Sequence, residues 1–510
     1  MKKLNTLLII LLMAAETMLL NGNIYSQVGQ AWVARFLGPN NNFSVSSIAL
    51  DSTGNIILTG MTLDSTGQHY CTVKYNQTGI LQWASFYKGS NQWSIDLARA
   101  VGVDANGNVY VTGQSGGGMS NNDYCTVKYN SNGVQQWVAR YHFPGTSDNE
   151  AYSLAIDNNG NIFVTGFSGS YSASIMYSSS GDSLWTSRYY SLVGWFAAID
   201  NQNNPIITGT SNAGMTTIKY NSSGAQQWVA TYPGASYKVK TDILNNVYIT
   251  GMGDGSKYVT IKYNSTGVQQ WKQTYIEPST GWVKDIAVDK NQNVFITGWV
   301  FFNTTRKHDY GIVKYNIGGA QQWANIYNGS ANDNDESYSI AVDDSSNIYV
   351  TGLSIESSGS KFCTIKYNTM GVQQWLINYP GIAAAVLVDR WRNVYVCGIN
   401  SDTGILIKYS QFVQINNISF KTPKTYKLEQ NYPNPFNPNT KIKFSIPKKT
   451  HVQLKIYDVL GRIKELLIDK ELSPSVYEVT FNANNYSSGV YFYKMECGEF
   501  SDVKKAIVVK

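Results

Sequence analysis

The sequence predicts an all-β protein with two domains, and three observations support this fold class. Tyr (36) and Trp (13) are abundant while 15% of the 510 residues are charged, a balance typical of β-rich proteins, which pair aromatic side chains on pleated surfaces. Strand-like patterns recur in a fixed order through most of the chain. Residues 421–510 instead alternate apolar and polar positions, as half-buried strands do.

The first 26 residues predict a secretory signal peptide. Lys2 and Lys3 precede an apolar run that ends in small and polar residues, the layout of a cleavable export signal. We expect cleavage after Ser26, which would leave no transmembrane segment in the mature chain. The alternative is a retained membrane anchor, but Glu16 interrupts the apolar run, which is short for a span of about 20 residues.

Charge and cysteine content exclude several classes of function. Residues 27–420 carry 23 Lys and Arg against 24 Asp and Glu, so this nearly neutral region lacks the clustered cations that bind nucleic acid. Five cysteines are too few and too scattered for a disulfide framework. Cys71, Cys125 and Cys363 occupy equivalent repeat positions and are expected to be small buried residues. With four histidines in the chain, we expect no metal site and no cofactor.

A repeating unit organises residues 27–420. Its first pattern leads through an Asp and a tight turn into a strand that ends in Gly, as in "GVDANGNVYVTG". The second is a strand ending in Lys-Tyr-Asn, and the third is "GVQQWVARY" or a relative. Four short strands in each unit of 42 to 54 residues are typical of a β-propeller blade. The Asp of the first pattern occurs eight times, as Asp51, Asp104, Asp157, Asp200, Asp242, Asp289, Asp343 and Asp389.

The number of strands of each kind predicts eight blades and a way to close the ring. The last unit ends at Tyr409 and is followed by "SQFVQINN", which lacks the Gly and Trp of a fourth strand. The orphan segment "QAWVARFLG" at residues 30–38 supplies that strand. We therefore predict an eight-bladed β-propeller closed by its N-terminal strand, with no open sheet edge.

Residue types at fixed repeat positions agree with a ring. Two residues before each Asp, six of eight residues are Ala or Gly, as expected where inner strands converge. The single Trp of each fourth strand is expected to pack between blades. The Lys that ends most third strands is expected to lay its stem there too, although Met176 replaces it in one unit.

The motifs "D..GN.YVTG" and "KYN..G..QW" resemble the bacterial β-propeller repeat called SBBP. The resemblance covers residues 27–420 through eight successive units. It implies a secreted or surface protein and says little about chemistry. The family is often described with seven blades, whereas eight are counted here.

Residues 421–510 predict a small immunoglobulin-like sandwich. They resemble the C-terminal sorting domain, type A, of the type IX secretion system. That resemblance implies that residues 426–510 engage the type IX machinery, that a Bacteroidota-like cell exports the protein across its outer membrane, and that the module is removed before release or surface attachment. The alternative is an ordinary adhesive domain. The motif residues are Tyr432, Pro433, Asn434 and Pro435 in "NYPNPFNP", Gly461 in "YDVLGR", and Gly489 and Tyr491 in "SSGVYFYK".

The variable loops on one face of the ring are the expected place for a ligand. Trp93, Trp195, Trp282 and Trp299 fall in or beside these loops. They either bind a carbohydrate or surface-protein ligand or pack over the ends of their own blades.

Other candidate residues point to structure rather than catalysis. The Asp-rich turns lack the ligands of a calcium loop, and the acidic stretch at residues 332–336 is expected to be a solvated loop. His69, His142 and His308 lie in non-equivalent positions without a paired carboxylate motif. We therefore expect a non-catalytic binding or scaffold module. The alternative is a polysaccharide-acting enzyme, a glycosidase or lyase, with its site on the variable face.

Overall fold

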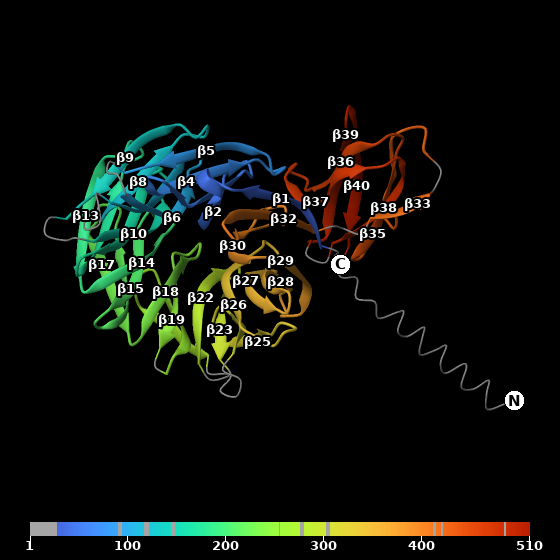
Figure 1. Cartoon of the computed structure of the whole chain (residues 1–510). Helices are drawn as coiled ribbons and strands as arrows, with labels where there is room; N and C mark the ends of the chain where they lie inside the picture. Colours follow the sequence, from blue (N-terminus) through green and yellow to red (C-terminus); the bar gives the residue numbers. More distant parts are fainter. Residues whose placement is uncertain are drawn as a thin grey trace. The chain divides into compact units, whose positions relative to one another are not determined.

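The computed structural model describes residues 28–89, 94–116, 122–143, 148–253, 255–275, 280–301, 307–411, 415–419, 422–483 and 486–509. Within these ranges the protein is all-β, and its one helical element is the 3-10 turn η1 (Pro39–Asn41). No helix of the described residues could span a membrane. The chain forms two compact units, residues 30–410 and a C-terminal unit that begins at residue 411 (Figure 1).

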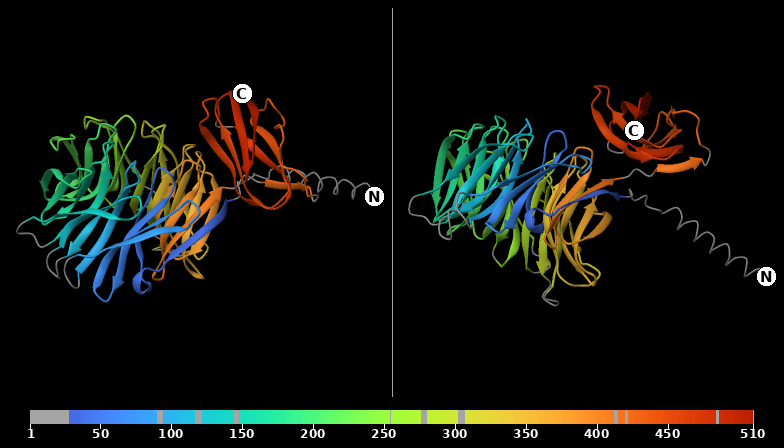
Figure 2. Two further views of the ribbon diagram at one scale, coloured as in Figure 1. Left: turned by 90° about the horizontal axis from the view of Figure 1, so that it is seen from above. Right: turned by 45° about the horizontal axis from the view of Figure 1, so that its top comes forward.

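The first unit is built from groups of four antiparallel strands, and Figures 1 and 2 show these groups following one another around a common centre. The first strands are β2 (Ser44–Leu50), β6 (Ser94–Val103), β10 (Asn149–Ile156), β14 (Leu192–Ile199), β18 (Ala235–Thr241), β22 (Thr280–Val288), β26 (Asp335–Val342) and β30 (Ile382–Val388). The second strands are β3 (Ile56–Asp64), β7 (Val109–Gly116), β11 (Ile162–Ser168), β15 (Pro205–Ser211), β19 (Val247–Gly253), β23 (Val294–Phe301), β27 (Ile348–Glu356) and β31 (Val394–Asn400).

The third and fourth strands complete each group. The third strands are β4 (Gly67–Tyr75), β8 (Asn122–Tyr129), β12 (Tyr171–Tyr177), β16 (Gly214–Tyr220), β20 (Lys257–Tyr263), β24 (His308–Tyr315), β28 (Gly359–Tyr367) and β32 (Thr403–Gln411). The fourth strands are β5 (Leu81–Tyr87), β9 (Gln135–Tyr141), β13 (Ser183–Tyr190), β17 (Gln226–Tyr232), β21 (Gln269–Tyr275), β25 (Gln321–Tyr327), β29 (Gln373–Pro380) and β1 (Val28–Phe36). A short parallel pairing of β4 with β6 joins the first two groups into one eight-stranded sheet.

The N-terminal strand completes the last sheet. The order of that sheet is β1-β32-β31-β30, so the fourth strand comes from the other end of the repeat region, where the strand count placed it. Ala34 of β1 and Tyr395 of β31 share an apolar cluster with Ile56 and Cys71 of the first group. The last sheet therefore packs on the first.

The Asp that precedes each second strand caps its own turn. Asp104 Oδ1 accepts hydrogen bonds from the backbone N–H groups of Asn106 (2.9 Å) and Asn108 (2.8 Å), and its Oδ2 accepts one from Asn108 Nδ2 (2.7 Å). The other seven Asp residues make the same three kinds of bond. These carboxylates are occupied by turn formation.

Tryptophan and lysine fasten neighbouring sheets together. Trp83 Nε1 and Lys74 Nζ both donate to the backbone oxygen of Ser131, in the next group, at 3.0 and 3.3 Å. Gly133 in that turn has φ 80°, and a Cβ there would lie 2.5 Å from the Trp83 ring. The expectation that the fourth-strand tryptophans pack between sheets is confirmed. The indoles that donate to a turn of the next sheet are those of Trp32, Trp83, Trp137, Trp185, Trp228, Trp271 and Trp323.

The cysteines are buried, reduced and apolar in character. Cys71, Cys125, Cys363, Cys397 and Cys497 are all free and buried. Burial raises the pKa of the Cys125 and Cys363 thiols to about 12. Because these thiols stay protonated, they act as small core residues, as expected.

The C-terminal unit consists of two four-stranded antiparallel sheets with the orders β33-β38-β35-β34 and β37-β36-β39-β40. Side chains from both sheets, including Ile442, Val479, Leu454 and Tyr493, form one apolar core. The strands are β33 (Ile415–Ser419), β34 (Lys427–Leu428), β35 (Asn439–Ile446), β36 (Thr450–Tyr457), β37 (Ile463–Leu472), β38 (Ser475–Asn482), β39 (Gly489–Cys497) and β40 (Phe500–Val508). β33 lies before the expected boundary at residue 420 but pairs with β38 of this unit.

The "NYPNPFNP" stretch is held against the last strand of this unit. Asn434 Nδ2 donates to Lys505 O (3.1 Å), and Ile507 N donates to Asn434 Oδ1 (2.8 Å). Pro433 O accepts a hydrogen bond from Thr440 Oγ1 (2.7 Å). The stretch is therefore an ordered part of the unit rather than a loose linker.

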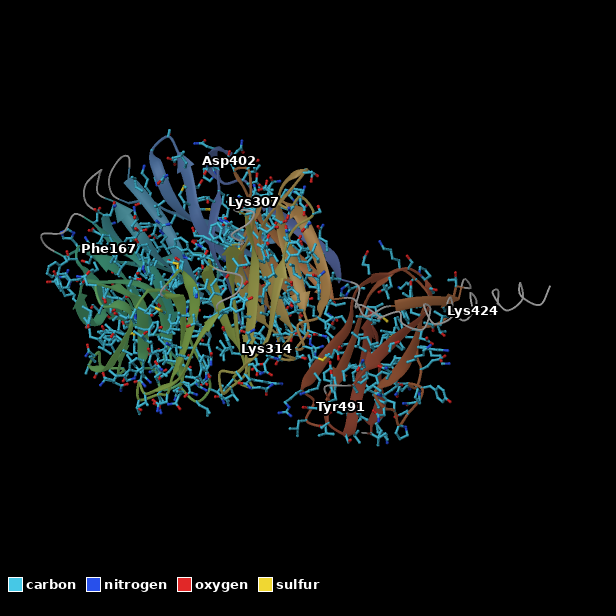
Figure 3. All side chains as sticks on the ribbon, turned by 90° about the horizontal axis from the view of Figure 1, so that it is seen from below. Phe167, Lys307, Lys314, Asp402, Lys424 and Tyr491 are labelled. Carbon is cyan, nitrogen blue, oxygen red and sulfur yellow. The ribbon has the colours of Figure 1, made fainter. Side chains whose placement is uncertain are left out.

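The other motif residues occupy the surface, a turn and strand β39, where Tyr491 is buried in the core. Tyr432 is 81% exposed, and Pro435 is also exposed. Gly461 has φ 73° in a turn capped by Asp458, whose Oδ1 accepts two backbone N–H bonds. Gly489 begins β39, and Tyr491, labelled in Figure 3, donates its hydroxyl to Ser487 O (3.1 Å).

Candidate binding site at the mouth of the central cavity

Every first strand contains a β-bulge at the same position, five residues before the turn Asp. In β10, Ala151 pairs with Gly166 and Ser153 with Thr165, so Tyr152 has no residue opposite it. Bulges redirect side chains and are frequent beside binding and active sites. We call the eight inserted residues the bulge ring: Ser46, Arg99, Tyr152, Trp195, Tyr237, Lys284, Tyr338 and Ala384.

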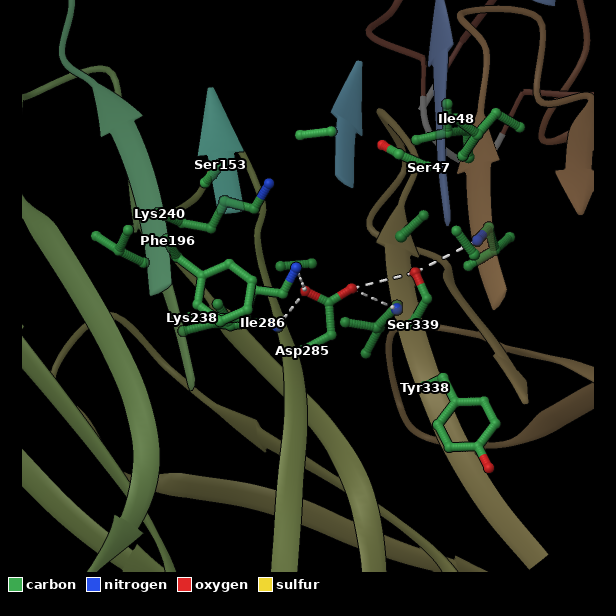
Figure 4. A pocket seen from close by; sticks show the side chains of 18 of the residues that line it. Ser47, Ile48, Ser153, Phe196, Lys238, Lys240, Asp285, Ile286, Tyr338 and Ser339 are labelled. Carbon is green, nitrogen blue, oxygen red and sulfur yellow. Dashed lines mark hydrogen bonds and ion pairs between the residues drawn. The ribbon is translucent and has the colours of Figure 1, made fainter. Parts of the chain in front are cut away.

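A central cavity of about 650 Å³ lies between the first strands, and all eight of them line it. Arg99, Tyr152 and Tyr338 of the bulge ring belong to its wall. Figure 4 shows the deeper part of the same wall, where Phe196, Lys238, Lys240 and Asp285 come from three successive strands. The bulge ring lies near the middle of the first strands, and the connectors of variable length precede these strands.

Aromatic rings occupy one arc of this ring. The Tyr152 and Trp195 centroids lie 4.7 Å apart, and Tyr237 on the next strand lies 5.6 Å from Trp282. We call these four half-buried side chains the aromatic arc. Half-buried aromatic rings beside a cavity are the usual wall of a ligand site.

Trp282 and Trp299 form a stack that extends outward from the arc. Their centroids are 5.5 Å apart, and the Trp299 ring lies 4.3 Å from the His308 ring at an interplanar angle of 11°. Phe301 packs edge-on against both Trp299 and His308. Trp299 thus contacts aromatic side chains of its own sheet, whereas Trp282 also contacts Tyr237 of the neighbouring sheet.

Two glutamates fix tyrosines of the bulge ring. Glu150 accepts hydrogen bonds from Arg99 (2.6 Å) and from the Tyr152 hydroxyl (3.1 Å). On the other side, Glu336 accepts from the Tyr338 hydroxyl (2.9 Å) and pairs with His308. Burial first, and then the neighbouring carboxylate, raises the pKa of both tyrosines, so their hydroxyls remain donors.

The structure corrects two expectations about ionisable residues. The three histidines do have carboxylate partners: His69 contacts Asp64 and Asp96, His142 contacts Asp123, and His308 contacts Glu336. The acidic stretch at residues 332–336 is not wholly solvated, because Asp335 is fully buried and accepts a hydrogen bond from Gly329 N (2.6 Å). Three of these carboxylates, Asp96, Asp123 and Glu336, are 27, 19 and 28 residues from their histidines in the sequence, so no local motif reveals the pairs.

Of the four tryptophans predicted as site residues, the structure brings Trp195 and Trp282 to the aromatic arc and places Trp299 behind Trp282. Trp93 lies outside the described residues. The sequence analysis missed Arg99, Tyr152 and Tyr237. Their common signal is a constant offset of five residues before each turn Asp.

Family comparisons agree with both parts of the chain. Residues 430–510 match the model of a secretion system C-terminal sorting domain, and residues 136–171 and 322–358 match that of a beta-propeller repeat. The chain therefore carries SBBP β-propeller repeats followed by a type IX sorting domain. It is a β-propeller protein of the kind exported by type IX secretion. No curated protein matches the sequence.

Solved structures resemble the propeller in fold. Sqt1 of Saccharomyces cerevisiae is 10% identical with a TM-score of 0.52, and the match covers 74% of this chain and 98% of that one. An inactive virginiamycin B lyase from Staphylococcus aureus, bound to quinupristin, is 11% identical with a TM-score of 0.41 and coverages of 75% and 99%. An ulvan lyase is 12% identical with a TM-score of 0.40 and coverages of 60% and 90%. At such identities the likeness to Sqt1 concerns the fold alone.

Proposed function

We propose that this protein is a non-catalytic binding module that recognises a carbohydrate at the aromatic arc. In this proposal residues 1–26 are a signal peptide that is removed, residues 27–420 form an eight-bladed propeller, and residues 421–510 form an immunoglobulin-like sorting domain. The type IX sorting domain indicates export to the cell surface or the extracellular space. A saccharide ligand suits that location.

The observation that carries the proposal is the bulge ring. All eight first strands carry a bulge at one position and line a single cavity. Three successive bulge residues are aromatic: Tyr152, which lines the cavity, and then Trp195 and Tyr237. Half-buried rings offer apolar faces for the C–H groups of a sugar, while nearby polar groups can receive its hydroxyls. The two glutamates of the mouth are already engaged by Arg99, His308 and tyrosine hydroxyls, which favours binding over acid–base chemistry.

One cluster favours the second candidate, a polysaccharide-acting enzyme. His308, Glu336 and Tyr338 lie within hydrogen-bond reach of one another in a chain. Tyr338 lines the cavity, and Tyr338 and His308 could serve as acid and base. Release of unsaturated or reducing ends from a bound polysaccharide, lost in His308→Ala, would support this candidate and contradict a non-catalytic role.

Binding of the purified full chain to a broad polysaccharide array tests the proposal. We expect at least one polysaccharide to bind, and Trp195→Ala and Tyr152→Ala each to weaken it tenfold or more. Tyr190→Ala is the matched control, because Tyr190 is 65% exposed at the end of β13 and lies outside the cavity wall. Equal loss in the control, or no binding by the folded protein, would overturn the proposal.

A further inference from the structure

Lys240 is a cation without a direct partner inside the central cavity. It lies on β18 two residues before Asp242, and its side chain lines the cavity wall. No hydrogen bond or ion pair within 4 Å reaches its ammonium group from the described residues. The equivalent residues of the other first strands are Ala49, Gly102, Ala155, Ala198, Ala287, Ala341 and Leu387. A lysine at this position is therefore not required by the packing of the repeat.

The carboxylate of Asp285, which attracts the Lys240 ammonium group electrostatically, has other partners. Asp285 Oδ2 accepts hydrogen bonds from Ser339 Oγ (3.1 Å) and Ile340 N (3.1 Å), and its Oδ1 accepts one from Ile286 N (3.0 Å). Lys238 Nζ lies 3.8 Å from Asp285 Oδ1. Figure 4 shows these contacts on one side of the cavity. Asp285 thus pairs with Lys238, while no ion pair within 4 Å joins Lys240 to a carboxylate of the described residues.

Lys240 carries its charge inside the central cavity. It is exposed to the solvent of the cavity, which all eight first strands line. Desolvation lowers the pKa of its ammonium group, Asp285 opposes this effect, and Lys238 adds to it. Arg99, the remaining cation of the wall, is paired with Glu150 at 2.6 Å. A bound anion could pair with the Lys240 ammonium group inside the cavity, where the walls would focus the field of that charge.

We propose that the cavity receives the anionic group of an acidic saccharide, a carboxylate or a sulfate ester, with Lys240 as its counter-charge. This inference rests on the proposed function and names its ligand class. Lys240 lies three residues beyond the bulge ring along the strand, which is roughly 10 Å at about 3.3 Å per residue. The acidic sugar therefore enters the cavity while the neighbouring part of the saccharide lies on the aromatic arc.

Two matched pairs of polysaccharides distinguish the sources of the anion: dextran sulfate against dextran, and polygalacturonate against its methyl ester. At physiological salt, the full chain is expected to bind the charged member of one pair at least tenfold more tightly than the neutral one. Lys240→Ala, which installs the residue found on most other first strands, is expected to abolish this preference. Lys290→Ala, at an exposed turn lysine, should preserve it. Equal preference in the wild type and Lys240→Ala would overturn the inference.

Inorganic sulfate gives a readout that does not depend on saccharide binding. Added sulfate is expected to raise the Tm of the wild type more than that of Lys240→Ala, at constant ionic strength. The rise in Tm caused by sulfate should decrease as pH rises, because Lys240 loses its charge. Since the pKa of Lys240 is lowered, this decrease should occur at a lower pH than the usual deprotonation of a lysine. An identical response in both proteins refutes the anion site. Saccharide binding by Trp195→Ala tests the proposed function at the aromatic arc, and the sulfate response of Lys240→Ala tests the anion site. Either proposal can therefore fail without the other.

Discussion

At the residue scale, one glycine in each turn between third and fourth strands has two roles: it adopts a positive φ, and it leaves room for a tryptophan ring of the preceding sheet. Gly133 adopts a positive φ and leaves room for the Trp83 ring of the preceding sheet. Trp83 in turn donates to Ser131 O of the same turn. Loss of either residue should therefore disturb the interface between two sheets rather than a single hairpin.

We expect Gly133→Ala to destabilise the propeller unit more than Gly160→Ala. Both glycines have φ near 80°, but a Cβ at residue 160 would meet only Ser179 Cβ at 3.9 Å. Gly160→Ala should cost about 1 kcal/mol for the backbone alone, and Gly133→Ala about 3 kcal/mol because the Trp83 ring must also shift. Urea unfolding followed by tryptophan fluorescence reports this unit, since no Trp occurs after residue 391. Equal costs would mean that the ring contact contributes little.

A buried carboxyl gives the stability a pH dependence. Burial, and then the nearby Asp335, raises the pKa of Asp309 to about 6 from 3.8. The folded state therefore holds a proton between about pH 4 and 6 that the unfolded chain releases, so this contribution to stability is present below pH 4 and is lost as pH rises through 6.

Asp309→Asn should remove that dependence. We expect the variant to be about 1–2 kcal/mol more stable than the wild type at pH 7 and nearly equal at pH 4. Denaturant unfolding at pH 4, 5, 6 and 7 measures the difference. Asp402→Asn, at an exposed loop carboxylate labelled in Figure 3, is the control and should change little. A constant difference across this range would contradict the assignment.

At the element scale, the fourth strand of the last sheet comes from the N-terminal end of the chain, whereas its other three strands are consecutive in the sequence. β1 pairs with β32, Trp32 donates to Gln77 O at 3.1 Å, and Arg35 donates to Tyr379 Oη at 2.6 Å. These contacts join the last sheet to the first group and to the sheet before it. β1 therefore contributes to two interfaces as well as to its own ladder.

Deletion of residues 28–38 should leave β32 as an open edge. We expect a Tm lower by roughly 10 °C or more, faster proteolysis and a tendency to associate through that edge. A synthetic peptide of residues 28–38 added in excess should restore part of the Tm, whereas a peptide with Trp32 and Ala34 replaced by Asp should not. Full stability without β1 would show that the last sheet closes without it.

The bulges show the limit of element-scale prediction from sequence. The first strands could be predicted from their alternation and their Asp, but a bulge shifts the side-chain alternation by one residue at its position. Alternation alone therefore does not predict that Tyr152, Trp195 and Tyr237 occupy equivalent bulges. The constant offset of five residues before the turn Asp, present in all eight units, is the sequence signal for the bulge ring.

At the scale of the whole molecule, the sorting domain and the proposed binding site belong to different units. Removal of residues 430–510 should retain the protein in the periplasm of a host with type IX secretion, because these residues match the sorting domain. Immunoblots of periplasm, cell surface and medium measure this. Trp195→Ala is the control and should be exported like the wild type. Surface display of the truncated protein would contradict the role of this unit.

The sequence alone determined the strand content, the repeated turn motifs, the pairing of the N-terminal strand with the last sheet and the C-terminal sorting domain. Each depends on local turn chemistry or on short motifs, which the order of residues carries directly. Only the tertiary structure decided which side chains meet: His69 with Asp96, Asp309 near Asp335, and Lys240 without a partner. These contacts join segments far apart in the chain across a ring. The distances between these side chains and their burial depend on how the sheets pack around the centre of the ring. The order of residues along the chain does not specify that packing directly.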